Sequence, residues 1–326
     1  MKCRRRQFLQ LAACAATLPA LSRRAAAQAY PTRPITMIVP IGAGSTGDIV
    51  GRVLAERMRA SLGQPIIVEN VSGAEGRIGT GRAARAMPDG YTIDLGFTSS
   101  HVLNGALYSL PYDVMNDFAP ISPLGTTPLV FYARNSMAAK DVTELIAWLK
   151  ANPNRASMGV VASSIRVLSA FLRKETGTQF ALVPYRGVAP AIQDLVAGQI
   201  DLLIGSPDQL PLMRAGSIKA YAVTRNTRIE LAPDIPTFAE LGLPALLWLP
   251  WYGLFAPRGT PKDTIRKLNA AVVEALADPA VRSRLIDLGL EIFPHEQQTP
   301  EALAALQKSD VEKWWPIIKE LGIKGP

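Results

Sequence analysis

The few residues that could support metal or nucleophilic chemistry are widely spaced. The chain has two histidines, His101 and His295, and both of its cysteines fall within the first 27 residues. A His/Cys metal site needs several such ligands close together, so we expect no metal and no cofactor. A Ser-His-Asp hydrolase would have to begin from Ser99, Ser100 and His101, but the chain lacks the Gly-x-Ser-x-Gly turn that presents a nucleophilic serine. We therefore expect a binding role rather than an enzyme.

A glycine-rich stretch, Gly42 to Gly47, follows a predicted strand and opens a predicted helix. It matches the Gly-x-Gly-x-x-Gly pattern of dinucleotide-binding folds, and Glu69 ends the next apolar run, where such folds carry a ribose-binding acid. Against that function, Pro40-Ile41 separate the strand from the glycines, and Asp48 places a negative charge where a pyrophosphate would bind. The stretch is either a tight strand-to-helix turn or the cofactor loop of an exported dinucleotide-dependent oxidoreductase, which is the alternative function.

These residues must be positioned by elements that alternate along the chain. Strands are predicted at 35–39, 65–69, 91–97, 180–183, 200–204 and 220–224, and helices at 48–62, 79–86, 142–150, 166–175, 189–197, 262–277, 279–288 and 300–321. This alternation predicts an α/β fold with parallel sheets covered on both faces, and ligands at the carboxyl ends of the strands. The length of 326 residues suits two such sheets.

The first 27 residues have the layout of a secretory signal peptide: a basic start, an apolar stretch at 8–21 and a run of small residues at 25–27. They hold six basic residues and no acid, so the formal charge of +8 becomes 29 basic against 27 acidic residues without them. That balance gives no reason to expect nucleic-acid binding. We expect export to the periplasm, by the general secretory route or by the twin-arginine route that Arg5-Arg6 suggests. Lipid anchoring at Cys14 is less favoured, because its apolar core would be short.

Several motifs follow one another in a fixed order after this leader. They include Tyr30-Pro31-Thr32-Arg33-Pro34-Ile35, Val68-Glu69-Asn70 with Gly73-Ala74, Pro88-Asp89-Gly90-Tyr91-Thr92, Leu110-Pro111-Tyr112-Asp113, Val183-Pro184-Tyr185-Arg186-Gly187 and Gly198-Gln199-Ile200-Asp201-Leu202. Their order and spacing resemble those of the Bug-type substrate-binding proteins of tripartite tricarboxylate transporters. The resemblance covers essentially the whole mature chain.

The resemblance implies a two-lobed periplasmic binding protein, a type II-like clamshell in which each lobe is a sheet flanked by helices and crossing strands join the lobes. On this basis we expect a signal peptide at 1–27, lobe 1 at 28–125 plus 255–326, and lobe 2 at 126–254. Such a protein captures a small carboxylate-bearing solute for uptake or sensing and has no catalytic activity. The implied partners are a small organic acid and either a membrane permease or a sensor, and we expect a monomer.

Members of this family bind a ligand carboxylate through backbone amides, hydroxyls and ordered water between the lobes. Amides at helix N-termini suit this task because they bind anions without a cationic side chain. The candidate ligand-binding residues that the resemblance implies are Gly42, Ala43, Gly44, Ser45, Thr46, Asp48, Ser99, Ser100, His101, Ser163, Ser164, Arg166, Tyr185, Gly187 and Asp208.

One of these loops departs from the family pattern. Where relatives commonly have Gly-Asn-Gly-Ser and a histidine three residues later, this chain has Val160-Val161-Ala162-Ser163 and then Arg166. The guanidinium favours a more strongly anionic solute, whereas the two valines favour a less polar one. Structural roles compete with these functions: Ser163 and Ser164 could cap a helix, and Arg166 could lie in solvent.

Overall fold

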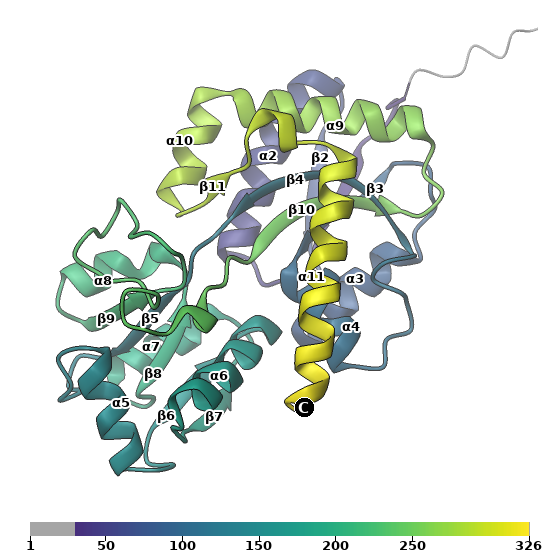
Figure 1. Cartoon of the computed structure of the whole chain (residues 1–326). Helices are drawn as coiled ribbons and strands as arrows, with labels where there is room; N and C mark the ends of the chain where they lie inside the picture. Colours follow the sequence, from purple (N-terminus) through teal and green to yellow (C-terminus); the bar gives the residue numbers. More distant parts are fainter. Residues whose placement is uncertain (1–29, 326) are drawn as a thin grey trace, which may run out of the picture.

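The computed structural model describes residues 30–325, so the predicted signal peptide and the lipid-anchoring site at Cys14 lie outside the described residues. Two separate sheets, each flanked by helices, make up these residues (Figure 1). We call the six-stranded sheet with its helices lobe 1 and the five-stranded sheet with its helices lobe 2. The predicted α/β architecture with two sheets is therefore confirmed.

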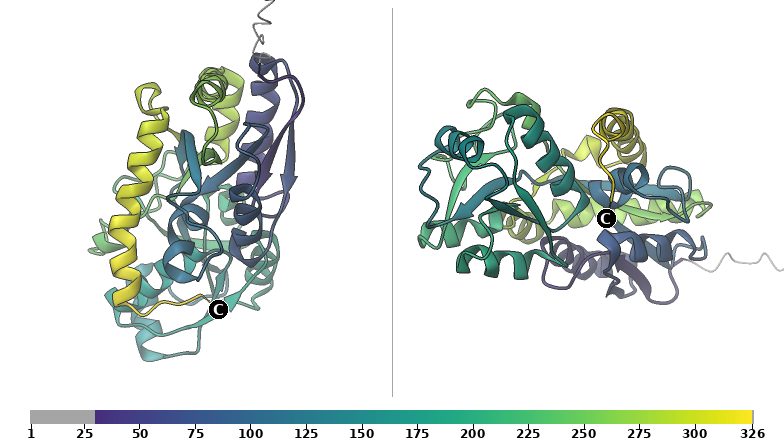
Figure 2. Two further views of the ribbon diagram at one scale, coloured as in Figure 1. Left: turned by 90° about the vertical axis from the view of Figure 1, so that its right-hand side faces the viewer. Right: turned by 90° about the horizontal axis from the view of Figure 1, so that it is seen from below.

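Lobe 1 contains the strands in the order β11 (Glu291–Ile292), β4 (Phe118–Thr126), β10 (Trp251–Pro257), β3 (Thr92–Phe97), β1 (Ile35–Val39) and β2 (Ile66–Asn70). Its helices are α2 (Thr46–Leu62), α3 (Arg77–Ala84), α4 (Asn104–Leu107), α9 (Lys262–Ala277), α10 (Pro279–Asp287) and α11 (Pro300–Glu320). Side chains of β1 alternate between the two faces: Met37 packs into the cluster under α2 and α9, and Ile38 into the cluster on the other face. The long helix α11 lies against β4 and crosses the front of the sheet (Figures 1 and 2).

Lobe 2 contains the strands in the order β7 (Ala181–Pro184), β6 (Ser157–Val160), β8 (Leu202–Gly205), β5 (Val130–Arg134) and β9 (Ile218–Val223). Its helices are α5 (Val142–Ala151), α6 (Ser163–Thr176), α7 (Val188–Ala197) and α8 (Leu210–Arg214). None of the helices within residues 30–325 combines the length and the apolar character that crossing a bilayer requires.

The expectation of purely parallel sheets is wrong. Strands β1, β2 and β3 run parallel, but β10 is antiparallel to both β3 and β4. In lobe 2, β6, β7 and β8 run parallel, while β5 is antiparallel to β8 and β9. The reason is the connectivity: β5 and β10 are the strands by which the chain enters each lobe from the other, so they run against the strands built by helical crossovers.

The two connections between the lobes are hydrogen-bonded to one another. The amide of Thr127 donates to the carbonyl of Pro250 at 2.8 Å. The hydroxyl of Thr224 accepts from the amide of Leu129 at 2.8 Å and donates to the carbonyl of Trp248 at 2.7 Å. The crossing segments therefore form one paired unit rather than two independent linkers. We call this unit the strap; it comprises Thr127–Leu129, Thr224 and Trp248–Pro250.

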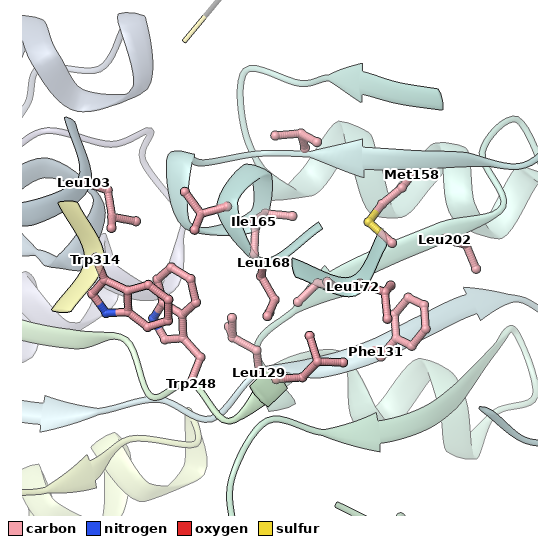
Figure 3. Packing of buried hydrophobic residues seen from close by; sticks show 14 of the residues in the cluster. Leu103, Leu129, Phe131, Met158, Ile165, Leu168, Leu172, Leu202, Trp248 and Trp314 are labelled. Carbon is pink, nitrogen blue, oxygen red and sulfur yellow. The ribbon is translucent and has the colours of Figure 1, made fainter. Parts of the chain in front are cut away.

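An apolar cluster continues from one lobe into the other. Side chains of β5, β6 and α6 in lobe 2, among them Phe131 and Leu168, belong to the same buried cluster as Leu103 and Trp314 of lobe 1 (Figure 3). Trp248, on the strap, completes the connection between the two sets. The structure therefore has the lobes packed together, with apolar contact near the strap.

Candidate functional site

The start of α2 is organised by its own loop. Ser45 caps the helix by accepting from the amide of Asp48, and its hydroxyl donates to the carbonyl of Gly42 at 2.7 Å. The carboxylate of Asp48 accepts from the amide of Gly44 at 2.9 Å and from the side chains of Arg52 and Asn70. Burial would raise the pKa of Asp48, but these hydrogen bonds outweigh it and hold that pKa below its usual value of 3.8. Asp48 therefore shapes the loop and is fully occupied with that role.

Gly42 and Gly44 of this loop are open on their outer side. A Cβ added at Gly42 or Gly44 would meet no atom within 4 Å, and Gly44 has a positive φ of 78°. Ala43 and Gly44 are exposed. The backbone of this loop can therefore approach another group closely.

Thr46, the first residue of α2, contacts lobe 2 directly. Its hydroxyl donates to Asp208 Oδ2 at 3.1 Å and lies 3.3 Å from the hydroxyl of Ser206. Ser206 donates in turn to Asp208 Oδ1 at 2.8 Å, and its carbonyl accepts from the phenol of Tyr132 at 2.9 Å. Burial, with the charge of Asp208 as a smaller contribution, raises the pKa of Tyr132 well above 10.0, so this phenol remains a donor.

The start of α6 is completed by lobe 1. Its N-cap is Ala162, which has no side chain able to cap, so the suggestion that Ser163 or Ser164 caps the helix is wrong. The amide of Ser164 donates instead to the hydroxyl of Ser99, at 3.2 Å across the two lobes. Ser163 lies at 2.5 Å from both Glu75 Oε2 and Asn104 Oδ1. The helix also begins three residues earlier than predicted, which places Ser163 in its first turn.

Arg166 reaches across to lobe 1 rather than into solvent. Its Nη2 lies 3.1 Å from Glu75 Oε1, and the two side chains are 13% and 18% exposed. Val160, one of the two valines that favour a less polar solute, is buried in the apolar core, because it ends β6 on the covered face. We call the polar contact surface between the lobes the seam; it contains Thr46, Glu75, Ser99 and Asn104 from lobe 1 and Ser163, Ser164, Arg166, Ser206 and Asp208 from lobe 2.

His101 and Ser100 do not reach the seam. The π-helical turn Ser99–Leu103 buries both completely, and the imidazole stacks on Phe255 with ring centroids 4.1 Å apart. Ser100 Oγ lies 3.0 Å from His101 Nδ1, and His101 Nε2 lies 3.5 Å from Asp94 Oδ2. Burial raises the pKa of Asp94 well above 3.8 and lowers that of His101 to about 3. This constellation is inaccessible, so it is a structural element of the core of lobe 1.

Tyr185 and Gly187 follow β7, and the side chain of Tyr185 is hydrogen-bonded within lobe 2. The phenol of Tyr185 donates to Asp194 Oδ2 at 2.6 Å, within lobe 2. Burial, together with Asp194, raises the pKa of this phenol to about 12. A Cβ on Gly187 would meet nothing within 4 Å.

Sequence reasoning missed three members of the seam, namely Glu75, Asn104 and Ser206. Glu75 lies in the glycine-flanked turn Ala74–Gly76, and both Ala74 and Glu75 adopt positive φ values, of 47° and 56°. A glycine-rich turn after a strand was the available signal, because such turns face ligands in α/β folds. Within residues 30–325 there is no cluster of three His, Cys, Asp or Glu that could hold a metal. The shallow surface hollows beside Arg59 and beside Asn154 lie at the opposite ends of α2 and α6.

The chain is similar to one protein family over most of its length and to solved periplasmic proteins. The model of the tripartite tricarboxylate transporter family receptor, TctC, matches residues 50–323. BugT from Bordetella pertussis is 34% identical over 303 residues, which cover 91% of this chain and 92% of BugT. The periplasmic binding protein BugD has a TM-score of 0.85 and 36% identity, covering 90% of this chain and 99% of BugD. MatC from Rhodopseudomonas palustris, with bound malate, has a TM-score of 0.84 and 35% identity, covering 89% of this chain and 100% of MatC. This chain belongs to the TctC family of tripartite tricarboxylate transporter receptors.

Proposed function

We propose that this protein is a periplasmic receptor that binds a small organic acid between its two lobes. The observation that carries the proposal is the convergence of donors at the seam, where the first turns of α2 and α6 face the other lobe. Helix N-termini and hydroxyls bind carboxylates well, because both offer hydrogen-bond donors and the helix dipole is positive there. MatC, which has this fold and holds malate, supports an acid as the ligand.

The proposed ligand contacts are the backbone of Gly42–Thr46 from lobe 1 and the first turn of α6 from lobe 2. Ser99, Ser163 and Ser164 would offer hydroxyls or amides, with Asp208 as an acceptor for a ligand hydroxyl. Ser100 and His101 are not proposed as contacts, because they lie in the core of lobe 1 away from the seam, and Asp48 is not proposed because its carboxylate would repel an acid. Tyr185 and Gly187 are proposed as the outer rim of the site on lobe 2.

The dinucleotide-dependent alternative has less support. A pyrophosphate on the Gly42–Gly47 loop would bring two negative charges against the buried carboxylate of Asp48, whereas a single carboxylate group brings one. A receptor without catalytic activity accounts better for the loop.

The wider proposal concerns domain limits, delivery and export. We propose domain limits near 28–125 with 255–326 for lobe 1 and 126–254 for lobe 2, hinged at the strap; Thr126 of β4 and Trp251–Leu254 of β10, at these limits, pair within the sheet of lobe 1. A membrane permease would receive the acid, or a sensor would read the closed form. We further propose that the chain acts as a monomer and is exported by a signal peptide at 1–27.

Thermal unfolding of the mature protein with a panel of mono-, di- and tricarboxylates tests the proposal. An acid at 100 times its Kd stabilises the folded state by about 2.7 kcal/mol, which is readily measured as a rise in Tm. NAD and NADP serve as the contrasting ligands. A rise with an acid and none with the dinucleotides is expected; a rise only with a dinucleotide would reject the receptor function.

A further inference from the structure

The carboxylate of Glu75 occupies the place where an anion would be expected at the start of α6. It accepts from the hydroxyl of Ser163 and lies against the guanidinium of Arg166, although Glu75 belongs to the other lobe. Helix α6 has 14 residues, no acidic residue in its first turn and no side-chain cap. Glu75 therefore supplies the negative charge that this helix terminus favours.

The backbone holds Glu75 in this position at some cost. Ala74 and Glu75 are consecutive non-glycine residues with positive φ, a conformation that L-residues avoid and that structures retain at functional sites. The fully buried side chain of Asn104 donates to the carbonyl of Glu75 at 3.0 Å and so fixes the turn. Arg77, the neighbouring cation, is directed elsewhere: its Nε donates to the carbonyl of Ala74, and its guanidinium stacks over the ring of Tyr108.

Building on the proposed acid-binding function, we propose that Glu75 determines ligand specificity by excluding a second carboxylate from the α6 end of the seam. Arg166 is the side chain that could grip such a group, but its charge is already matched by Glu75. A dicarboxylate would have to displace Glu75 or bring a like charge against it, in a partly buried setting where repulsion is weakly screened. An acid with one carboxylate and a neutral remainder meets no such penalty.

This inference reverses the sequence-based expectation that Arg166 favours a dianion. Loss of the charge at position 75 should restore that preference, because Arg166 would then be available for two charge-assisted hydrogen bonds. The gain for a diacid over a monoacid of equal length is expected to be about tenfold to a hundredfold in Kd.

Calorimetric titration with butanoate against succinate, and with pentanoate against glutarate, tests the inference. The variants are Glu75→Gln, which keeps the shape, and Glu75→Gly, which also relaxes the positive φ and so protects folding. Arg166→Gln and the double variant Glu75→Gln/Arg166→Gln show whether the gain requires the guanidinium. Glu320→Gln is the matched control. Glu320 of lobe 1 pairs with Lys174, which lies on α6 as Arg166 does, but both side chains of this pair are at least half exposed.

The wild type and Glu320→Gln should prefer the monoacid, both Glu75 variants should gain the diacid, and the double variant should lose that gain. If the wild type binds an acid and the Glu75 variants have the same ratio of monoacid to diacid affinity as the wild type, the role of Glu75 is rejected while the receptor function stands. A wild-type preference for the diacid rejects it as well. If neither the wild type nor any variant binds any of these acids, both proposals are rejected.

Discussion

The indole of Trp248, on the strap, stacks on the indole of Trp314 in α11, with ring centroids 4.1 Å apart and planes at 18°. Phe171 of α6 forms a T-shaped pair with the same Trp314 ring, with ring centroids 5.6 Å apart. Trp248 and Trp314 are 4% and 3% exposed. Trp314 of lobe 1 therefore packs against both the strap and lobe 2, and this apolar contact joins the two lobes (Figure 3).

Trp314→Ala should lower the free energy of unfolding by about 3–5 kcal/mol and also weaken acid binding, because it removes a buried aromatic and loosens the lobe contact. Chemical denaturation and calorimetric titration measure the two effects. Trp315→Ala is the control, since its indole donates to the carbonyl of Val102 within lobe 1. The control should lose stability but keep its affinity for the acid. An unchanged acid affinity in Trp314→Ala would contradict the role of Trp314 in joining the lobes.

Thr46→Val keeps the shape of the side chain but removes the donor to Asp208. Acid binding should weaken by about tenfold, since a hydrogen bond to a charged group contributes about 1.5–3 kcal/mol and helps to hold the lobes together. Thr260→Val removes a hydroxyl that donates to Pro257 within lobe 1 and should leave affinity unchanged. Equal affinity losses in the two variants would show that Thr46 has no special role at the seam.

Gly42→Ala tests the α2 loop without straining it, because a Cβ there meets nothing within 4 Å and φ is not positive. The unfolding free energy should change by less than about 0.5 kcal/mol, as for an uninvolved surface site, while acid affinity falls because the methyl group stands where the backbone approaches the ligand. Gly44→Val should lower both the unfolding free energy and the acid affinity, since the φ of 78° at this position adds strain of about 1–2 kcal/mol. Full affinity in Gly42→Ala would remove this loop from the site.

The pair Asp94 and His101 predicts a pH dependence of stability. The raised pKa of Asp94 and the lowered pKa of His101, about 3, leave one proton on the folded pair, carried by Asp94. The contribution of Asp94 to stability is therefore lost as pH rises from 3.8 toward its raised folded pKa, whereas that of His101 is lost as pH falls from 6.5 toward about 3. Below 3.8 the unfolded pair gains a second proton before His101 does, and stability falls again.

Asp94→Asn should remove the contribution of Asp94 and leave that of His101, so the variant should lose stability as pH falls below 6.5, because neutral His101 is then the group that must stay unprotonated. The change in slope should approach about 1.4 kcal/mol per pH unit. Urea denaturation of both proteins from pH 5 to pH 9 measures it as the difference between the two curves. Parallel curves would mean that Asp94 is ionised in the folded protein.

The sequence predicted most helices because each shows a long apolar periodicity, as in α2, α9 and α11, which agree with prediction to within two residues. It missed β4, β5, β6, β10 and the two-residue strand β11. Strand β4 contains Pro120 and Pro123, which oppose strand formation, and its register with β10 shifts at irregularities. Strand β6 is only four residues long and contains a glycine.

The candidate site was predictable where it lies on local signals and not where it depends on distant contacts. Thr46, Ser99, Ser163 and Ser164 follow strand ends or open helices, so their place could be expected. Glu75 lies 91 residues from Arg166 in the chain, and only the packing of the two lobes brings them together. His101 showed the same loop signal as Ser99, but a π-helical turn directs it into the core.

A crystal structure of the mature protein with the acid that gives the largest rise in Tm tests the central claim most directly. We expect a carboxylate of the acid between the first turns of α2 and α6, within hydrogen-bond distance of Ser99, Ser163 or Ser164. An acid bound elsewhere, such as in the surface hollow beside Arg59, with the seam contacts unchanged, would contradict it.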